Sequence, residues 1–94
     1  MRVEWLQVAL DSVIAEAEAI SQYSPSLADR TVAAILDAVE NLQRFPALGR
    51  PGRVVGTREL VISGTPYIVA YRVRGDTVEL LLFLHAARKW PAGF

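Results

Sequence analysis

The segment "GRPGRVVGTREL", residues 49–60, concentrates positive charge in a stretch rich in glycine and proline. Arg50, Arg53 and Arg58 fall within nine residues, and the first acid after them is Glu59. Such guanidinium groups repel one another, and neighbouring glycines let a ligand approach the backbone closely. Because the guanidinium fork grips phosphate and carboxylate, these arginines are predicted to bind an anion. That anion is either a nucleic-acid phosphate or the acidic side chains of a protein.

RNA cleavage through the 2′-hydroxyl is one chemistry that such arginines could serve. It needs a base for the hydroxyl, cations for the phosphorane and an acid for the leaving oxygen. Arg58 and Arg72 can supply cations, and His85, the single histidine, can supply an acid or a base because imidazole titrates near neutrality. The alternatives are structural: His85 ends a strand and bonds a backbone carbonyl, and Arg72 is the polar member of an alternating strand.

The charges are unevenly divided along a chain whose formal net charge is zero. Residues 1–43 carry two arginines against seven acids, a net charge of −5, whereas residues 44–94 carry eight bases against three acids, a net charge of +5. This asymmetry indicates an acidic or polyanionic partner for the basic half. Nine of the ten bases are arginine, which reflects either anion binding or the codon usage of a GC-rich genome.

Length and composition limit the possible protein classes. The 94 residues fit a single domain over residues 1–94, and a hydrophobic content of 52% predicts one core with a surplus for an interface. The absence of cysteine excludes disulfides and thiolate metal sites and suggests the cytoplasm. The start "MRVEWLQVAL" does not match a signal peptide, and no apolar run approaches the ~20 residues that span a bilayer. No metal, cofactor or membrane partner is expected.

The hydrophobic periodicity predicts a strand and then two helices. Residues 2–5 alternate, and a helical period begins at Leu6. Ser24 can cap a second helix that has Pro25 at its first position, and Pro46 ends it. The two predicted apolar stripes contain Leu6, Leu10, Val13, Ala17 and Ile20 in the first helix, and Val32, Ile35, Leu36, Val39 and Leu42 in the second.

Three strands are predicted after the arginine-rich loop, over residues 57–63, 66–73 and 77–85. Residues 74–76, "RGD", form a tight hairpin turn between the last two. The segment 77–85 is apolar on both faces, so it is expected to be a central strand with both sides covered. The predicted class is α+β, in the order β-α-α-β-β-β, with an antiparallel sheet and an N-terminal helical hairpin packed on one face.

This order of elements resembles the RelE/ParE superfamily of toxins from bacterial type II toxin–antitoxin modules. The segments "RFPALGRPGRVVGTREL" and "PYIVAYRVRGDTVELLLFLHAARKWP" carry the resemblance, which covers nearly the whole chain. It implies a growth inhibitor that a cognate antitoxin neutralises by wrapping its C-terminal segment around the toxin. RelE-like and YoeB-like members cut mRNA in the ribosomal A site, whereas ParE-like members block DNA gyrase; fold alone does not separate the two.

Two departures from the RNA-cutting pattern favour the ParE-like interpretation. Those members usually carry a basic residue just before the central strand, where this chain has Pro66, Tyr67 and Ile68, and the ending "LHAARKWP" is closer to ParE-like members. The predicted target- or anion-binding residues are Arg50, Arg53, Arg58, Arg88, Lys89 and Trp90. The alternatives are a metal-independent, ribosome-dependent mRNA endonuclease with Arg58, Arg72 and His85 as catalytic residues, or a degenerate member that binds its antitoxin without being toxic.

Overall fold

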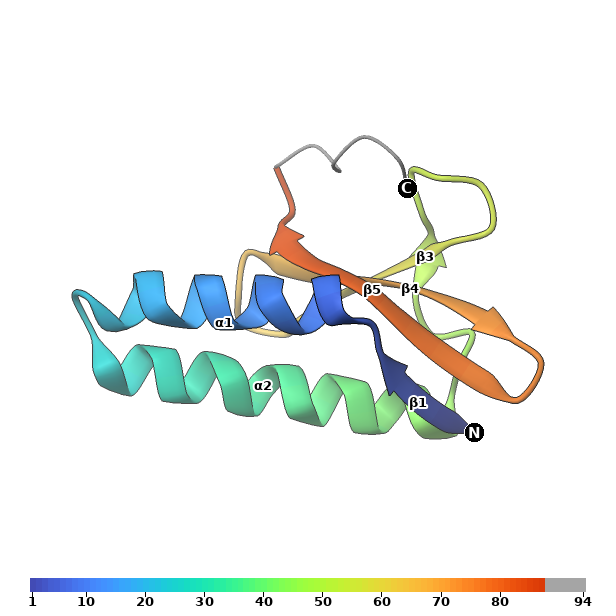
Figure 1. Ribbon diagram of the computed structural model, residues 1–94, viewed down its shortest axis with the longest axis horizontal. Helices are drawn as coiled ribbons and strands as arrows, with labels where there is room; N and C mark the ends of the chain where they lie inside the picture. The colour runs from blue at the N-terminus through green and yellow to red at the C-terminus, as the bar shows by residue number, and fades with distance from the viewer. Residues whose placement is uncertain (88–94) are drawn as a thin grey trace.

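A helical hairpin packs against one face of a five-stranded sheet in the computed structural model, which describes residues 1–87 (Figure 1). This α+β arrangement confirms the predicted fold class. The elements are β1 (Arg2–Trp5), α1 (Gln7–Ser21), α2 (Pro25–Arg44), β2 (Arg50–Pro51), β3 (Arg58–Val61), β4 (Tyr67–Arg74) and β5 (Thr77–His85).

Local signals set the ends of the second helix as predicted. The Ser24 hydroxyl accepts a hydrogen bond from the Leu27 N–H at 3.2 Å, and Pro25 occupies the first turn, where its missing N–H costs nothing. The helix ends after Arg44, whose positive charge suits the C-terminal end of the helix dipole. No helix within residues 1–87 is long and apolar enough to cross a membrane.

The strand order is β1-β5-β4-β3-β2, and the sheet is mixed rather than purely antiparallel. β1 runs parallel to β5, with Val3 opposite Val78, while the other neighbours are antiparallel. A central strand needs a partner on each edge, and β1 supplies the second partner for β5. The two-residue strand β2 was not predicted, because two residues are too few to show an alternating pattern.

The main core lies between the helices and the sheet. Ile35, Leu42, Tyr71 and Leu80 are at most 1% exposed there. A second buried cluster on the opposite face contains Ile68, Ala70, Leu81, Leu82 and Leu84, which confirms that β5 is buried on both faces. A bulge between Ala70 and Tyr71 shifts the register with β5 at this point.

The predicted helical stripes were wrong at two positions. Leu10 is 42% exposed and Leu36 is 56% exposed, whereas Ala9 and Ala38 are buried. Ala9 and Ala38 belong to the main core cluster, together with larger residues such as Ile35 and Leu42. Hydrophobic periodicity favours large residues and does not reveal which small ones permit a close approach.

Candidate functional site

Two of the three arginines in the 49–60 segment are paired with an acid of the same segment. Glu59 is 3% exposed, and pairing between β2 and β3 places it opposite Arg50. Arg50 Nη2 lies 3.3 Å from Glu59 Oε1, and Arg53 Nε lies 3.2 Å from Oε2. The Arg53 N–H also donates to Oε2 at 3.0 Å. A buried carboxylate requires such partners. Glu59 therefore neutralises part of the positive charge of the arginines that were predicted to bind an external anion.

Arg58 and Tyr71 tie the preceding loop to the sheet. Arg58 Nη1 donates to the carbonyls of Gly49 at 2.7 Å and Ala47 at 3.4 Å. The Tyr71 hydroxyl donates to the Pro46 carbonyl and accepts from the Gly49 N–H, both at 2.8 Å. Burial raises the pKa of Tyr71, and the Gly49 N–H and the nearby Arg58 charge partly offset this rise.

Gly49 is confined by the same tyrosine. A Cβ atom at this position would lie 2.7 Å from Tyr71 Cε1 and 2.8 Å from its hydroxyl. No real Cβ atom tolerates such distances, so the loop reaches the tyrosine only with glycine here. The glycines of this segment were predicted to let a ligand approach the backbone. Gly49 instead allows the loop to contact Tyr71 of the same chain.

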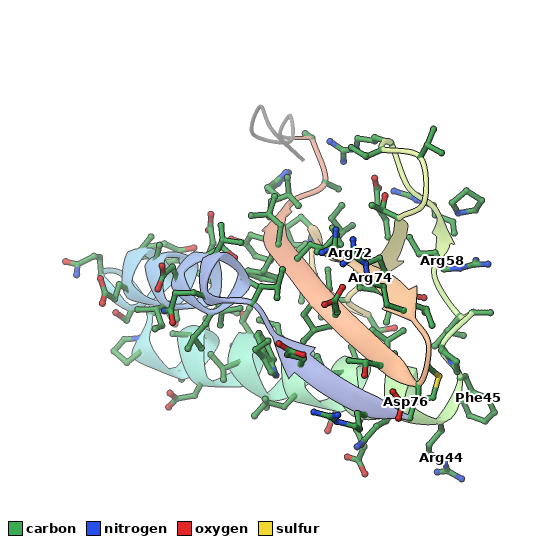
Figure 2. The ribbon with its side chains drawn as sticks, turned by 45° about the vertical axis from the view of Figure 1, so that its right-hand side comes forward. Arg44, Phe45, Arg58, Arg72, Arg74 and Asp76 are labelled. Carbon is green, nitrogen blue, oxygen red and sulfur yellow. The ribbon has the colours of Figure 1, made fainter. Side chains whose placement is uncertain are left out.

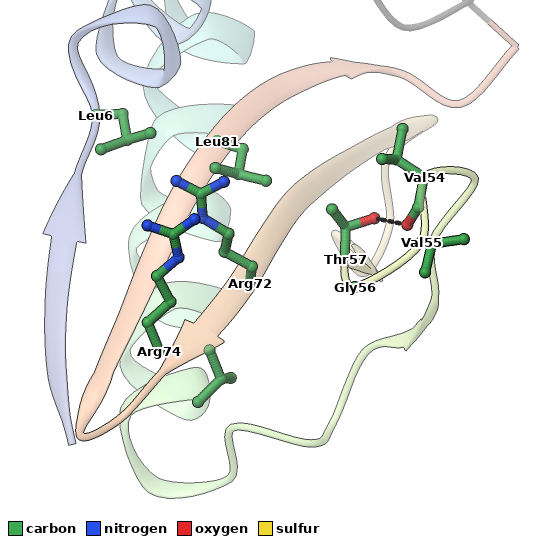
Figure 3. A pocket seen from close by; sticks show the side chains of 9 residues that line it. Leu6, Val54, Val55, Gly56, Thr57, Arg72, Arg74 and Leu81 are labelled. Atoms are coloured by element: carbon green, nitrogen blue, oxygen red, sulfur yellow. Dashed lines mark hydrogen bonds between the residues drawn. The ribbon is translucent and has the colours of Figure 1, made fainter. Parts of the chain in front are cut away.

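Arg72 and Arg74 line a pocket on the face of the sheet opposite the helices (Figure 3). Their Nε atoms lie 2.7 Å and 3.4 Å from Glu79 Oε1, so two positive charges share one negative charge. The pocket has a volume of about 540 Å³ and is also lined by Leu6, residues 54–57, Val73 and Leu81. A hydrogen bond of 2.6 Å from Thr57 Oγ1 to the Val54 carbonyl braces the loop at its rim. The pocket therefore combines excess positive charge with apolar walls.

The structure does not bring the three predicted catalytic residues together. Arg58 pairs in register with Tyr71, whose side chain faces the helices, whereas Arg72 faces the opposite side. Figure 2 shows Arg58 pointing away from Arg72 and Arg74.

His85 lies apart from Arg72. It is six residues along β5 from Glu79, the partner of Arg72, a span of about 20 Å. Its Nδ1 accepts a hydrogen bond from the Ala87 N–H at 3.1 Å, and its ring makes a T-shaped contact with the ring of Tyr67. The structural alternative predicted a bond from this strand-end histidine to a backbone carbonyl, but the backbone group that it bonds here is the Ala87 N–H.

The pocket beside Arg72 and Arg74 holds no general acid or base. Its lining residues, all within residues 1–87, include neither a histidine nor a carboxylate. Glu79, which is not among the lining residues, is already paired with both arginines. The predicted contacts of Arg88, Lys89 and Trp90 lie outside the described residues and stay predictions.

Comparisons with known proteins point to one class. A family model described as "ParE toxin of type II toxin-antitoxin system, parDE" matches residues 3–90. "Putative toxin Y4kP" from Sinorhizobium fredii is 43% identical over 96% of this chain and 93% of its own length. "Toxin RelE2" from Caulobacter vibrioides is 33% identical over 93% of this chain and 97% of its own. The solved structure "Chromosomal ParDE TA system from P. aeruginosa" has a TM-score of 0.80 and 26% identity, covering 90% of this chain and 95% of that one.

Proposed function

This chain belongs to the ParE toxin family and is the toxin component of a type II toxin–antitoxin system, and we propose that it arrests growth by protein contact with DNA gyrase. An antitoxin is its partner within that system. Gyrase is proposed as the target because ParE-like members are described as blocking it. Since that target is cytoplasmic, the proposal places the chain in the cytoplasm.

The observation that carries the contact mechanism is the separation of the charged groups. Arg72 and Arg74 supply cations in a pocket without an acid or base among its lining residues. Arg58 lies on the other face of the sheet and is hydrogen-bonded to the Gly49 carbonyl. General acid–base catalysis needs these groups within reach of the same phosphate, and their present arrangement does not provide that.

The same pocket suits a protein surface that presents a carboxylate next to apolar side chains. Two guanidinium groups share Glu79, which leaves one positive charge for an incoming acid. Val55, at the rim, is fully exposed, and Val73 is 42% exposed. Arginine is enriched in the central part of protein interfaces, and the exposed valines add apolar surface beside it.

The test is to induce the protein in cells, map transcript 5′ ends by sequencing, and follow a DNA-damage reporter. We expect growth arrest with a damage response and intact messages. The double variant R72A/R74A should reduce the arrest, while R30A, which removes an exposed arginine of α2, should not.

The name of one relative, "Toxin RelE2", is the reason to test the endonuclease alternative as well. The same induced cells test it. New cuts at codon positions within translated messages that disappear in H85A would contradict the contact mechanism. Absence of arrest together with antitoxin binding would identify a degenerate member.

A further inference from the structure

The loop between β2 and β3, residues 52–57, presents an apolar side chain to solvent. Val55 lies at the turn of this loop and is 100% exposed. A side chain that is completely exposed adds nothing to the core, so folding does not explain a valine here. Single exposed apolar residues are common on protein surfaces, so a role for Val55 depends on how the loop holds it.

Hydrogen bonds fix the main chain on both sides of Val55. The Gly52 N–H donates to the Thr57 carbonyl at 2.8 Å, and the Thr57 N–H donates to the Val54 carbonyl at 3.1 Å. The Thr57 hydroxyl donates to the same Val54 carbonyl at 2.6 Å. These bonds close the turn over residues 54–57. Val55 is therefore displayed in one orientation relative to the sheet.

Two glycines make this tight loop possible. A Cβ atom at Gly52 would collide with the Thr57 hydroxyl, so the two strands of the hairpin approach each other only with glycine there. Gly56, next to Val55, has a φ of +85°, in the left-handed region that other residues rarely adopt. A side chain that is held in place before binding loses little conformational freedom when it binds. Val55 is thus suited to anchor a partner.

The base of the loop is tied to the sheet by Arg53. Its N–H donates to Glu59 Oε2 at 3.0 Å, and its Nη2 donates at 2.7 Å to the carbonyl of Ala86, just after β5. These contacts hold the loop beside the Arg72–Arg74 pocket, which residues 54–57 help to line. Figure 3 shows the loop on one side of this pocket and the two arginines on the other.

The charge and polarity around the loop select the kind of partner. Arg72 and Arg74 share Glu79, so an acidic group complements the pocket beside Val55. A nucleic-acid backbone would satisfy the arginines but not the valine. A second copy that used the same surface would place like charges opposite each other, which is unfavourable. A protein with an apolar hollow and a carboxylate at its rim matches both features.

We propose that the 52–57 loop is a preformed recognition element that inserts Val55 into an apolar hollow of DNA gyrase, while a carboxylate at the rim pairs with Arg72 and Arg74. This inference rests on the proposed function, since it names the anchor residue and the chemistry of the gyrase surface. The two parts act differently. Charge mainly speeds association, whereas a buried apolar anchor mainly slows dissociation.

The experiment measures the association and dissociation rates of the full chain with purified DNA gyrase. V55T keeps the shape of valine but adds a hydroxyl that an apolar hollow does not satisfy. V8T is its control, because Val8 is 41% exposed on α1 and does not line the pocket.

A second pair of variants tests whether the loop must be preformed. G56A places a side chain at a φ of +85°, and G64A does the same at a φ of +77° in the turn between β3 and β4. A Cβ atom would meet nothing within 4 Å at either position, so both variants strain the backbone without a clash. Their melting temperatures should fall by similar amounts, but only G56A should disturb the display of Val55.

Support would be dissociation about tenfold or more faster for V55T, affinity about fivefold or more weaker for G56A, and wild-type rates for V8T and G64A. R72A/R74A should instead slow association. Wild-type dissociation of V55T would overturn the anchor and leave the gyrase target intact. An equal loss of antitoxin affinity in V55T would overturn it in favour of an antitoxin contact, and self-association of the wild type that V55T abolishes would overturn it in favour of a second copy. Growth arrest without any binding to gyrase would overturn both the anchor and the proposed target.

Discussion

Replacing Glu59 by glutamine tests whether the arginine-rich segment is held by an acid of its own. The carboxylate is 3% exposed and contacts Arg50, Arg53 and the Arg53 N–H. Glutamine has nearly the same shape and keeps one acceptor, but it carries no charge. The variant therefore removes the charge and little else.

The expected cost follows from these contacts. A hydrogen bond to a carboxylate contributes about 1.5–3 kcal/mol and a neutral one about 1 kcal/mol, so the Arg53 N–H loses roughly 1 kcal/mol. The two ion pairs involve arginine side chains that are 58% and 36% exposed, and each adds about 0.5 kcal/mol after solvent screening. The sum is about 2 kcal/mol, or a fall in Tm of roughly 8–16 °C for a domain of this size.

Thermal unfolding of E59Q, with amide exchange over residues 50–57, measures this effect. E79Q is the matched control, because Glu79 also pairs with two arginines but is 15% exposed. Its expected cost is at most about 1 kcal/mol. If E59Q and E79Q melt together and exchange in the loop is unchanged, Glu59 does not hold the segment and its arginines are available to a ligand.

Three further predictions concern the loop and the core. G49A forces a Cβ against Tyr71 and should lower the free energy of unfolding by about 1–3 kcal/mol in urea titrations; an unchanged midpoint would contradict the contact. Because the pKa of Tyr71 is raised in the folded state, the wild type should lose stability as pH rises past about 10, and Y71F should not show this loss. I35A should cost about 2–5 kcal/mol, but L36A less than about 1 kcal/mol, since their side chains are 1% and 56% exposed; equal losses would contradict this burial pattern.

The elements that the sequence predicted well are those with local signals. Ser24 followed by Pro25 predicts a helix start because capping depends on neighbouring residues. The segment 77–85 matches β5 at both ends because its apolar run is bounded by a turn and a histidine. These features need no knowledge of what the segment contacts.

The elements that the sequence did not reveal depend on contacts between distant residues. The parallel pairing of β1 with β5 joins residues some 75 positions apart, a contact that periodicity does not encode. Arg50 meets Glu59 because the register between β2 and β3 places them opposite each other. Arg58 and Arg72 face opposite sides of the sheet because the register between β3 and β4 pairs Arg58 with Tyr71. Register thus decided which of the candidate site residues meet.

The most direct test of the contact mechanism is supercoiling of relaxed plasmid by purified DNA gyrase with increasing amounts of the toxin. We expect inhibition by the wild type, weaker inhibition by R72A/R74A, and release of inhibition when the antitoxin is added. Full supercoiling at toxin concentrations that arrest cells, with cleavage of mRNA in a translation reaction run in parallel, would contradict the central claim.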